Sequence, residues 1–413
     1  MGWWREGALA MRPWQAVLLI LVLAALAISS GWKDLYVLTY VLLALFVLSW
    51  LWARDSLRKV AFRRVTSGSR IQVGEVFEER LMLENLSVTP KLWIQVADGS
   101  TLPAHRAGYV ASMGGRQRAL WRARTLCRQR GLFRLGPISA TGGDPFGLFR
   151  RRTVLSPAQE LLVLPRILPI TSFSLFTGGL PGRGKSSRRA LQTTTNATTI
   201  REYVMGDALS RIHWRSSAHY NKLMVKEFDL DPALDVWIFL DLHKRVQAGT
   251  GEHSTEEYGV TIAATVATYL LRQDFSIGMI VNGRQREFLA LDRGDRQVVR
   301  VLETLAVVTA GDGPELQEAL AMDAFHLGRN TAAVVITPSN TQHWHEGVRQ
   351  LQQRGVEVAV IGLDAASFKK SPADEDTLAL LEGSGIPVLR IKCKDPLTQI
   401  LEGGSDARYA QRR

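Results

Sequence analysis

The stretch GLPGRGKS, residues 179–186, fits the phosphate-binding pattern G-x-x-x-x-G-K-[ST]. In a working P-loop, backbone N–H groups surround the phosphates between the end of a buried strand and the start of a helix. The flanks supply neither element, because TSFSLFTGG upstream is polar at alternate positions and QTTTNATTI downstream is poor helix material. We therefore expect a Gly/Ser/Arg linker here. A nucleotide hydrolase that uses Lys185 and Ser186 is the alternative.

A dense polar segment, REYVMGDALSRIHWRSSAHYNKLMVKEFDLD, follows at residues 201–231. Its charged residues alternate with apolar ones, which is unusual for a connector. Asp207, directly after Gly206, is a candidate helix N-cap, and Arg211 follows four residues later, within pairing range. The stretch LMVKEF predicts a short strand.

The charges of this segment have two interpretations. Arg–carboxylate pairs could hold a turn between two domains or form a docking face. His213 could instead act as an acid or base beside Asp207 or Glu202. Since no nucleophile, base and orienting group can be assembled from the spacing, we favour the structural or docking role. A hydrolase that uses His213 is the alternative.

Two uncharged apolar runs, residues 13–32 and 35–53, precede these candidate sites. Each is close to the roughly 20 residues that a helix needs to cross a bilayer. Only Lys33 and Asp34 separate the runs, so we expect an antiparallel transmembrane hairpin. Tryptophan side chains favour the headgroup region, and four lie near the expected span ends: Trp14, Trp32, Trp50 and Trp52.

Basic residues set the expected orientation of the hairpin. Arg5 and Arg12 precede the first span, and a basic cluster at residues 54–64 follows the second. We therefore expect a plasma-membrane protein with both termini in the cytoplasm. A cleaved signal peptide, which would place the body outside the cell, is the alternative. The two cysteines, Cys127 and Cys393, form no disulfide framework and no metal spacing, which suits a reducing compartment.

The formal net charge of +12 over 413 residues raises the question of nucleic-acid binding. Many basic residues lie next to the expected membrane surface, where they would meet anionic lipid, and others alternate along an expected strand. Basic side chains on solvent-exposed faces, together with attraction to an anionic membrane surface, explain the positive charge better than nucleic-acid binding does. We expect no nucleic-acid partner, and a nucleic-acid-binding protein is a further alternative.

Residues 56–165 have the pattern of β structure. RLMLENLS and KLWIQVAD predict strands bounded by turn residues. In LWRARTLCRQR, Trp121, Ala123 and Thr125 share one face, and Arg122 and Arg124 share the other. This alternation predicts an antiparallel β-sandwich that closes at GGDPFGLFRRR, where glycines, Asp and Pro mark a turn.

From residue 233 the pattern changes to alternating strands and helices. DVWIFLDL, SIGMIVNG, TAAVVITPS, VEVAVIGLD and IPVLRIK predict buried strands, with helical stretches between them. Such alternation predicts a doubly wound α/β domain. Ligands of these sheets lie beyond the carboxyl ends of the strands, where this chain has Asp241, the stretch 337–340 and Asp364.

The expected organisation is a tail and transmembrane hairpin over residues 1–55, a β-sandwich over 56–165, a linker with the polar segment over 166–232, an α/β domain over 233–395 and a C-terminal tail over 396–413.

The polar segment resembles the signature of the bacterial family named domain of unknown function 58. That signature reads approximately R-E-Y-x-x-G-D-x-x-R-x-I-H-W-x-x-[ST]-A-x-x-x-x-L-x-V-[KR]-E-[FY]. The matching residues are Arg201, Glu202, Tyr203, Gly206, Asp207, Ile212, His213, Trp214, Ala218, Leu223, Val225, Lys226, Glu227 and Phe228. Arg211 lies one position after the arginine of the pattern, where this chain has Ser210. The resemblance extends to the two apolar runs, to DPFGLF at residues 144–149 and to the α/β domain. The G-x-x-x-x-G-K-S stretch is not part of this signature.

The resemblance implies an α/β domain similar to von Willebrand factor A domains. It also implies a membrane protein that acts beside a MoxR-type AAA+ ATPase, often with a transglutaminase-like membrane protein. ATP chemistry would then belong to the ATPase. The signature residues would serve as a docking face or a clamp between domains.

A metal-dependent adhesion site of that domain type needs Asp-x-Ser-x-Ser after the first strand, with Thr and Asp from other loops. This chain has DLHKR at residues 241–245, in which Asp241 stays while Lys244 and Arg245 bring positive charge. In TPSN, residues 337–340, Thr337 stays and Pro338 replaces the acid. We therefore expect a degenerate remnant, Asp241 with Thr337, that holds no metal and no other cofactor.

The function expected from these observations is a non-enzymatic, membrane-anchored scaffold or adaptor with a protein-binding α/β domain. It would act with the MoxR-type ATPase in the assembly or maturation of client proteins.

Overall fold

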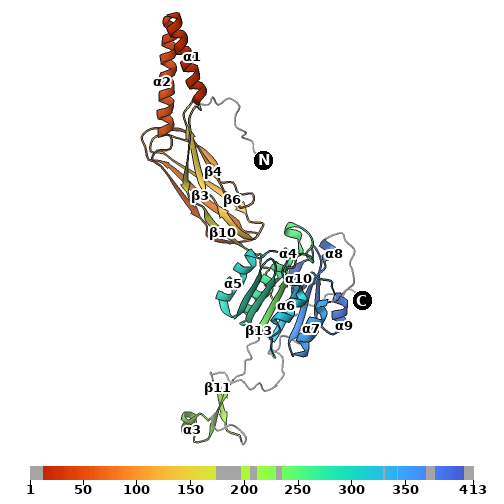
Figure 1. Cartoon of the computed structure of the whole chain (residues 1–413). Coiled ribbons are helices and arrows are strands. Elements are labelled where there is room, and N and C mark those ends of the chain that lie inside the picture. The colour runs from red at the N-terminus through yellow and green to blue at the C-terminus, as the bar shows by residue number, and fades with distance from the viewer. Residues whose placement is uncertain are drawn as a thin grey trace. The chain divides into compact units, whose positions relative to one another are not determined.

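The computed structural model describes residues 13–173, 197–204, 212–228, 235–328, 331–341, 343–368 and 377–403. The chain divides into two compact units, residues 1–165 and 166–413. The stretch GLPGRGKS, the signature residues Gly206 and Asp207, and Arg211 lie outside the described residues. Figure 1 shows the elements of each unit.

Unit 1 begins with two long apolar helices that pack side by side, α1 (Pro13–Ser30) and α2 (Lys33–Asp55) (Figure 1). Their apolar sequences and their lengths of 18 and 23 residues are compatible with membrane spans. Most of their large apolar side chains are exposed, as expected for helices that face lipid. Gly31, at φ +65°, provides the left-handed position between the two helices.

The helix α2 leads into the first strand after a short turn. Side-chain hydrogen bonds and packing hold the end of α2 against the strands. Lys91, 2 % exposed, donates from Nζ to Asp55 Oδ2 at 2.7 Å, and Thr89 Oγ1 donates to the same carboxylate at 2.6 Å. At Gly142, an added Cβ would lie 3.1 Å from Ser56 Oγ and from a Leu57 methyl group. The end of α2 is therefore packed against the strands of unit 1.

A sheet-rich region makes up the rest of unit 1. Its strands are β1 (Val60–Thr66), β2 (Arg70–Gln72), β3 (Val76–Asn85), β4 (Lys91–Asp98), β5 (Tyr109–Met113), β6 (Arg118–Leu126), β7 (Gly131–Leu135), β8 (Ile138–Gly143), β9 (Arg150–Ser156) and β10 (Gln159–Leu164). They form sheets with the orders β1-β3-β6, β2-β10-β7 and β5-β4-β8-β9. One hydrophobic cluster contains Leu83 of β3, Ile94 of β4 and Ile138 of β8, so the first and third sheets share a core.

The alternation expected along residues 120–130 is confirmed in β6. Ala123 and Thr125 are buried, whereas Arg122 and Arg124 are exposed. Burial on one face of a pleated strand follows from its two-residue period.

A buried polar network crosses this region. The carboxylate of Glu79 on β3 accepts from Arg64 Nε at 2.7 Å and contacts His105 Nε2 at 3.1 Å. His105 also lies 3.3 Å from Asp98 Oδ2, and its Nδ1 is 2.9 Å from Thr125 Oγ1. Burial acts to raise the pKa of Glu79, but the hydrogen bond from His105 and the charge of Arg64 outweigh it and hold the pKa below its usual value.

Unit 2 contains a six-stranded mixed sheet. Its strands are β13 (Asp235–Asp241), β14 (Ser276–Asn282), β15 (Arg286–Asp292), β16 (Thr331–Thr337), β17 (Glu357–Leu363) and β18 (Val388–Ile391), in the order β15-β14-β13-β16-β17-β18. Only the pairing of β14 with β15 is antiparallel among these described strands. Residues of β13, β14, β16 and β17 are almost all buried, as in a sheet covered on both faces.

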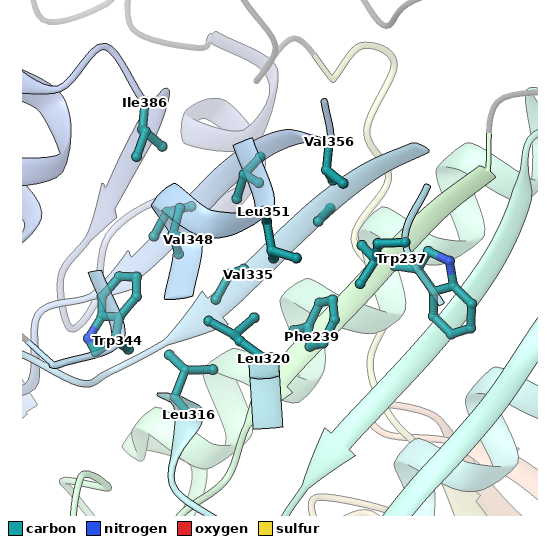
Figure 2. Close-up of a cluster of buried hydrophobic side chains, with 14 of the residues drawn as sticks. Trp237, Phe239, Leu316, Leu320, Val335, Trp344, Val348, Leu351, Val356 and Ile386 are labelled. Carbon is teal, nitrogen blue, oxygen red and sulfur yellow. The ribbon is translucent and has the colours of Figure 1, made fainter. Parts of the chain in front are cut away.

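Helices cover both faces of this sheet. They are η2 (Gly251–His253), α4 (Thr255–Arg272), α5 (Gly294–Val307), α6 (Leu316–Asp323), α7 (His343–Gln353), α8 (Ala365–Phe368), α9 (Thr377–Gly383) and α10 (Leu397–Gly403). Figure 2 shows Leu320 of α6 and Val348 of α7 among the side chains that pack on Phe239 and Val335 of the sheet. On the other face, Gly259 of α4 lies close to Leu240 and Leu363.

The strands and the longer helices predicted for residues 235–392 are confirmed, with shifts of one or two residues at their ends. Four elements were not predicted: the edge strand β15, the helix α6 and the short helices η2 and α8. Two boundaries also differ from the prediction. Residues 166–173, expected as linker, pack on the α/β region, where Leu168 N donates to Thr265 Oγ1 at 3.1 Å and Thr171 N donates to Glu402 at 2.6 Å. The expected tail begins with the helix α10, in which Leu401 is buried.

Candidate functional site

The polar segment forms a strand pair with a short helix between the strands. β11 (Ala197–Glu202) pairs antiparallel with β12 (Met224–Phe228), and α3 (Trp214–Tyr220) precedes β12. The register places Arg201 opposite Val225, and positions 226 and 227 opposite Ile200 and Thr199. The strand predicted from LMVKEF is thereby confirmed, and the signature residues Arg201, Glu202, Lys226 and Glu227 come together on this pair. Tyr203 continues the pairing, since its N–H donates to Leu223 O at 2.8 Å.

His213 caps the start of α3 rather than pairing with a carboxylate. Its Nδ1 accepts from Ser216 N at 3.2 Å and lies 2.7 Å from Ser216 Oγ. Glu202, which we considered as a partner of His213, forms an exposed ion pair with Lys222 at 3.1 Å. Within the described residues, no carboxylate forms a hydrogen bond or ion pair with the ring of His213. A catalytic triad is therefore not assembled among them.

Trp214, at the first turn of α3, is 69 % exposed. A large aromatic side chain in this position buries much apolar area when a partner covers it. The sequence singled out Trp214 by its place in the signature, and its exposure marks it as the most accessible anchor of the segment.

The second candidate site is a crevice in the α/β region, at the carboxyl ends of β13 and β16. The chain passes from β13 to β14 on one side, and it later returns to β16 on the other side. The strand order therefore reverses between β13 and β16, which is where ligands bind in open α/β sheets. A cavity of about 290 Å³ lies there. Its walls come from the loop after β13, the start of α6, the loop after β16 and the start of α7.

Asp241 and Thr337, named from the sequence, meet at the base of this crevice. Thr337 Oγ1 donates to Asp241 Oδ2 at 2.7 Å, and the backbone N–H of His243 donates to Asp241 Oδ1 at 3.0 Å. Ser339 N in turn donates to Thr337 Oγ1 at 2.9 Å. Burial raises the pKa of Asp241, although the two hydrogen bonds and His243 oppose this rise. The environment thus favours the neutral acid more than water does.

The arrangement does not fit an adhesion-type metal site. Both carboxylate oxygens of Asp241 accept hydrogen bonds from the protein, and Arg245 lines the same cavity. Within the described part of the chain, no group of three or more His, Cys, Asp or Glu side chains could hold a metal ion. Asp364 is not among the residues that line the crevice, and its carboxylate accepts from Ala366 N at the start of α8. That the site takes no metal stays a prediction.

The sequence did not reveal most of the lining. His243, Glu315, Ser339, Thr341, His343 and Trp344 line the cavity beside Asp241 and Arg245. They come from separate loops and helix ends, and no spacing in the sequence links them. Arg245 forms a long ion pair with Glu315 at 3.7 Å, with both side chains mostly exposed. Trp344 is 1 % exposed, and its indole N–H has no hydrogen-bond partner among the described residues.

Comparison with known proteins gives one family match. Residues 199–368 match the family model described as "Protein of unknown function DUF58". The "Uncharacterized protein YeaD" of Bacillus subtilis (strain 168) is 21 % identical over 306 residues, which are 71 % of this chain and 74 % of that protein. The matched range contains both the described part of the polar segment and the loops of the crevice after β13 and β16.

Two of the similar solved structures are distant likenesses. Proximal thread matrix protein 1 from the mussel byssus is 13 % identical, with a TM-score of 0.29, over 41 % of this chain and 46 % of that one. The CARDB domain of the PF1109 protein from Pyrococcus furiosus is 13 % identical, with a TM-score of 0.20, over 25 % of this chain and 91 % of that one. Scores this low support no conclusion about this protein.

Proposed function

We propose that this chain, which belongs to the DUF58 family through residues 199–368, is a membrane-anchored adaptor that binds a protein partner and catalyses no reaction itself. The hairpin of α1 and α2 would hold it in the plasma membrane with both termini in the cytoplasm. The sheet-rich region would be a β-sandwich, and the α/β region a degenerate relative of von Willebrand factor A domains.

The main observation behind this proposal is that the carboxylate of Asp241 accepts hydrogen bonds from the protein itself. In an adhesion-type site, the corresponding carboxylate would face a cation that bridges to an acidic side chain of the partner. Here the carboxylate is bound by Thr337 and by the His243 amide, and Arg245 supplies the positive charge at the mouth of the crevice. An arginine can bind a carboxylate directly, with two parallel hydrogen bonds. The crevice therefore suits an acidic side chain of a protein partner without a metal.

The partner proposed from the family resemblance is a MoxR-type AAA+ ATPase, with a transglutaminase-like membrane protein as a second component. Trp214 supports a second contact area, because exposed tryptophans often become energetic centres of protein interfaces. Under this proposal, energy from ATP enters through the partner, and this chain positions clients at the membrane.

The test measures binding of the full chain in detergent to the MoxR-type ATPase of the same organism. We expect Trp214→Ala to weaken binding about 30-fold, the equivalent of about 2 kcal/mol for an interface centre. Arg245→Glu should weaken it at least about tenfold. The matched controls are Tyr220→Ala, an exposed aromatic of the same helix, and Arg296→Glu, an exposed arginine of α5.

Unchanged binding in both test variants would refute the docking role of these residues. Equal losses in the controls would show that charge or surface area alone matters. The circular dichroism of each variant establishes whether the fold is retained.

A hydrolase is the second candidate, favoured by one contact, the 2.7 Å distance from His213 Nδ1 to Ser216 Oγ. A serine next to a histidine is the minimum of a nucleophile and base pair. The same purified chain, incubated with ester and nucleotide substrates, distinguishes the two functions. Substrate turnover by the original chain that disappears in His213→Ala would show that the protein is an enzyme and would refute the adaptor proposal.

A further inference from the structure

A pocket of about 460 Å³ lies in unit 1, beside the end of α2. Four arginines, Arg54, Arg58, Arg150 and Arg151, line it together with the rings of Trp50 and Phe149. Two of the arginines follow the apolar run of α2, and two begin β9. The pocket therefore joins the end of an expected membrane span to the sheet-rich region.

The turn between β8 and β9, residues 144–149, positions one wall of this pocket. Asp144, fully buried, accepts from Phe149 N at 2.6 Å and from Phe146 N at 3.0 Å, and Gly147 adopts φ +74°. A carboxylate that accepts two backbone N–H groups makes a tight, preformed turn. This turn is the DPFGLF stretch, for which the proposed function gives no role.

One aromatic ring of the turn contacts the expected membrane span. Phe149 packs edge-on against Phe46 of α2, with ring centroids 5.2 Å apart. Phe46 precedes Ala53, the last residue of the uncharged run, by seven positions, or about 10 Å along the helix axis. Phe146 of the turn is 63 % exposed. The turn thus runs beside the last part of the apolar span and presents a ring outward.

Of the four arginines of the pocket, only Arg58 interacts electrostatically with a carboxylate of the described residues, that of Asp55. Among the described residues, no ion pair includes Arg54, Arg150 or Arg151. Arg54 instead lies over the ring of Trp50, 5.6 Å from its centroid. Asp55, beside Arg54 in the chain, is engaged by Lys91 and Thr89. A cluster of guanidinium groups with apolar rings at the edge of a bilayer matches a phosphate attached to lipid chains.

We propose that this pocket binds the phosphate group of an anionic membrane lipid. The arginines bind the phosphate, and the rings of Trp50 and Phe149 contact the upper part of the acyl chains. The inference rests on the membrane anchoring in the proposed function. Inorganic phosphate offers the same charge but no chains for the aromatic rings to contact.

The experiment first extracts membranes that contain the full chain with alkaline carbonate. Chain that leaves the membrane would refute the anchoring. The chain is then purified in a neutral detergent and titrated with short-chain phosphatidylglycerol, short-chain phosphatidylcholine or inorganic phosphate, and native mass spectrometry counts the bound molecules. The titration tests the pocket separately, because it needs no intact bilayer and no protein partner.

We expect one phosphatidylglycerol per chain, bound at least about tenfold more tightly than phosphatidylcholine. The double variant Arg150→Gln/Arg151→Gln should lose at least about tenfold in this affinity. The matched control, Arg122→Gln/Arg128→Gln, removes the same charge from exposed positions outside the pocket and should change it less than about twofold. Unfolding midpoints of both variants check that the fold is intact.

Equal affinities for the two lipids, or equal losses in the test and control variants, would overturn the proposal. Tight binding of inorganic phosphate without binding of the lipid would assign the pocket to free phosphate and overturn the lipid part. Loss of lipid binding in the test variant alone supports the pocket.

Discussion

Replacing Glu79 by glutamine should destabilise the sheet-rich region by about 3 kcal/mol. Glu79 and Arg64 are almost fully buried, and Arg64 Nε donates to the carboxylate at 2.7 Å while Nη2 lies 2.6 Å away. Apart from this ion pair, the buried nitrogens Nη1 and Nη2 form no hydrogen bond among the described residues. Removal of the carboxylate charge therefore leaves a buried guanidinium without a counter-charge, which typically costs about 3–5 kcal/mol. The lower end applies because glutamine keeps one acceptor oxygen.

Hydrogen exchange of the full chain in detergent measures this loss. Each 1.4 kcal/mol changes an opening constant about tenfold, so amides of β1 and β3 should exchange about 100-fold faster in the variant. In the exposed pair of Glu84 with Arg118, the arginine side chain is 63 % accessible, so Glu84→Gln should cost less than about 1 kcal/mol.

Two further measurements separate the charge from the packing. The double variant Glu79→Gln/Arg64→Met removes the unpaired cation and should return to within about 1 kcal/mol of the original stability. The pKa of Glu79 is held below its usual 4.5, so its contribution is complete above pH 4.5 and is lost as the pH falls through the lowered folded value. This account would be refuted if Glu79→Gln were as stable as the original chain at pH 7. It would also be refuted if the double variant were no more stable than Glu79→Gln alone.

Two more predictions concern the α/β region. Burial raises the pKa of Asp241 in the folded chain above its usual 3.8, so the original chain should lose stability as the pH rises from 3.8 through that raised pKa. The variant Asp241→Asn should lack this loss. Thermal unfolding of both proteins from pH 4 to pH 7 measures the difference. An identical pH dependence in both proteins would contradict the assignment. An added Cβ at Gly278 would lie 2.6 Å from the ring of Trp237, so Gly278→Ala should cost about 1–3 kcal/mol in denaturant unfolding. Gly328→Ala, where no atom lies within 4 Å of the added group, should cost less, and equal losses would show that the Trp237 contact is not the cause.

The sequence predicted most elements of the fold because their side chains repeat with a clear period. The apolar runs of α1 and α2 and the buried strands β13, β14, β16 and β17 are continuous or regular, and they were located within one or two residues. The edge strand β15 was missed although it had a signal. Asn282-Gly283 precedes the alternating stretch REFLALD, and Asn-Gly before alternating residues is a strong hairpin indicator.

The candidate site was predicted only in part, because its contacts join distant parts of the chain. Asp241 and Thr337 could be named from strand ends, since parallel strands bring their carboxyl ends to one edge. In unit 1, outside the candidate site, the pairs Asp55–Lys91 and Glu79–His105 likewise join residues that no sequence periodicity links. The capping of α3 by His213 depends on its backbone conformation, which residue spacing does not report. The roles of Gly206, Asp207 and Arg211 stay predictions.

The short connection between α2 and β1 has a mechanical consequence. With Asp55 held by Lys91 and Thr89, and with Phe46 packed on Phe149, the helix and the strands should rotate as one rigid lever. A change in bilayer thickness that tilts α2 would then swing the far end of the β-strands by an angle similar to that of the helix. Under the proposed anchoring, the hydrocarbon thickness of the membrane would thus set the tilt of these β-strands against the bilayer surface.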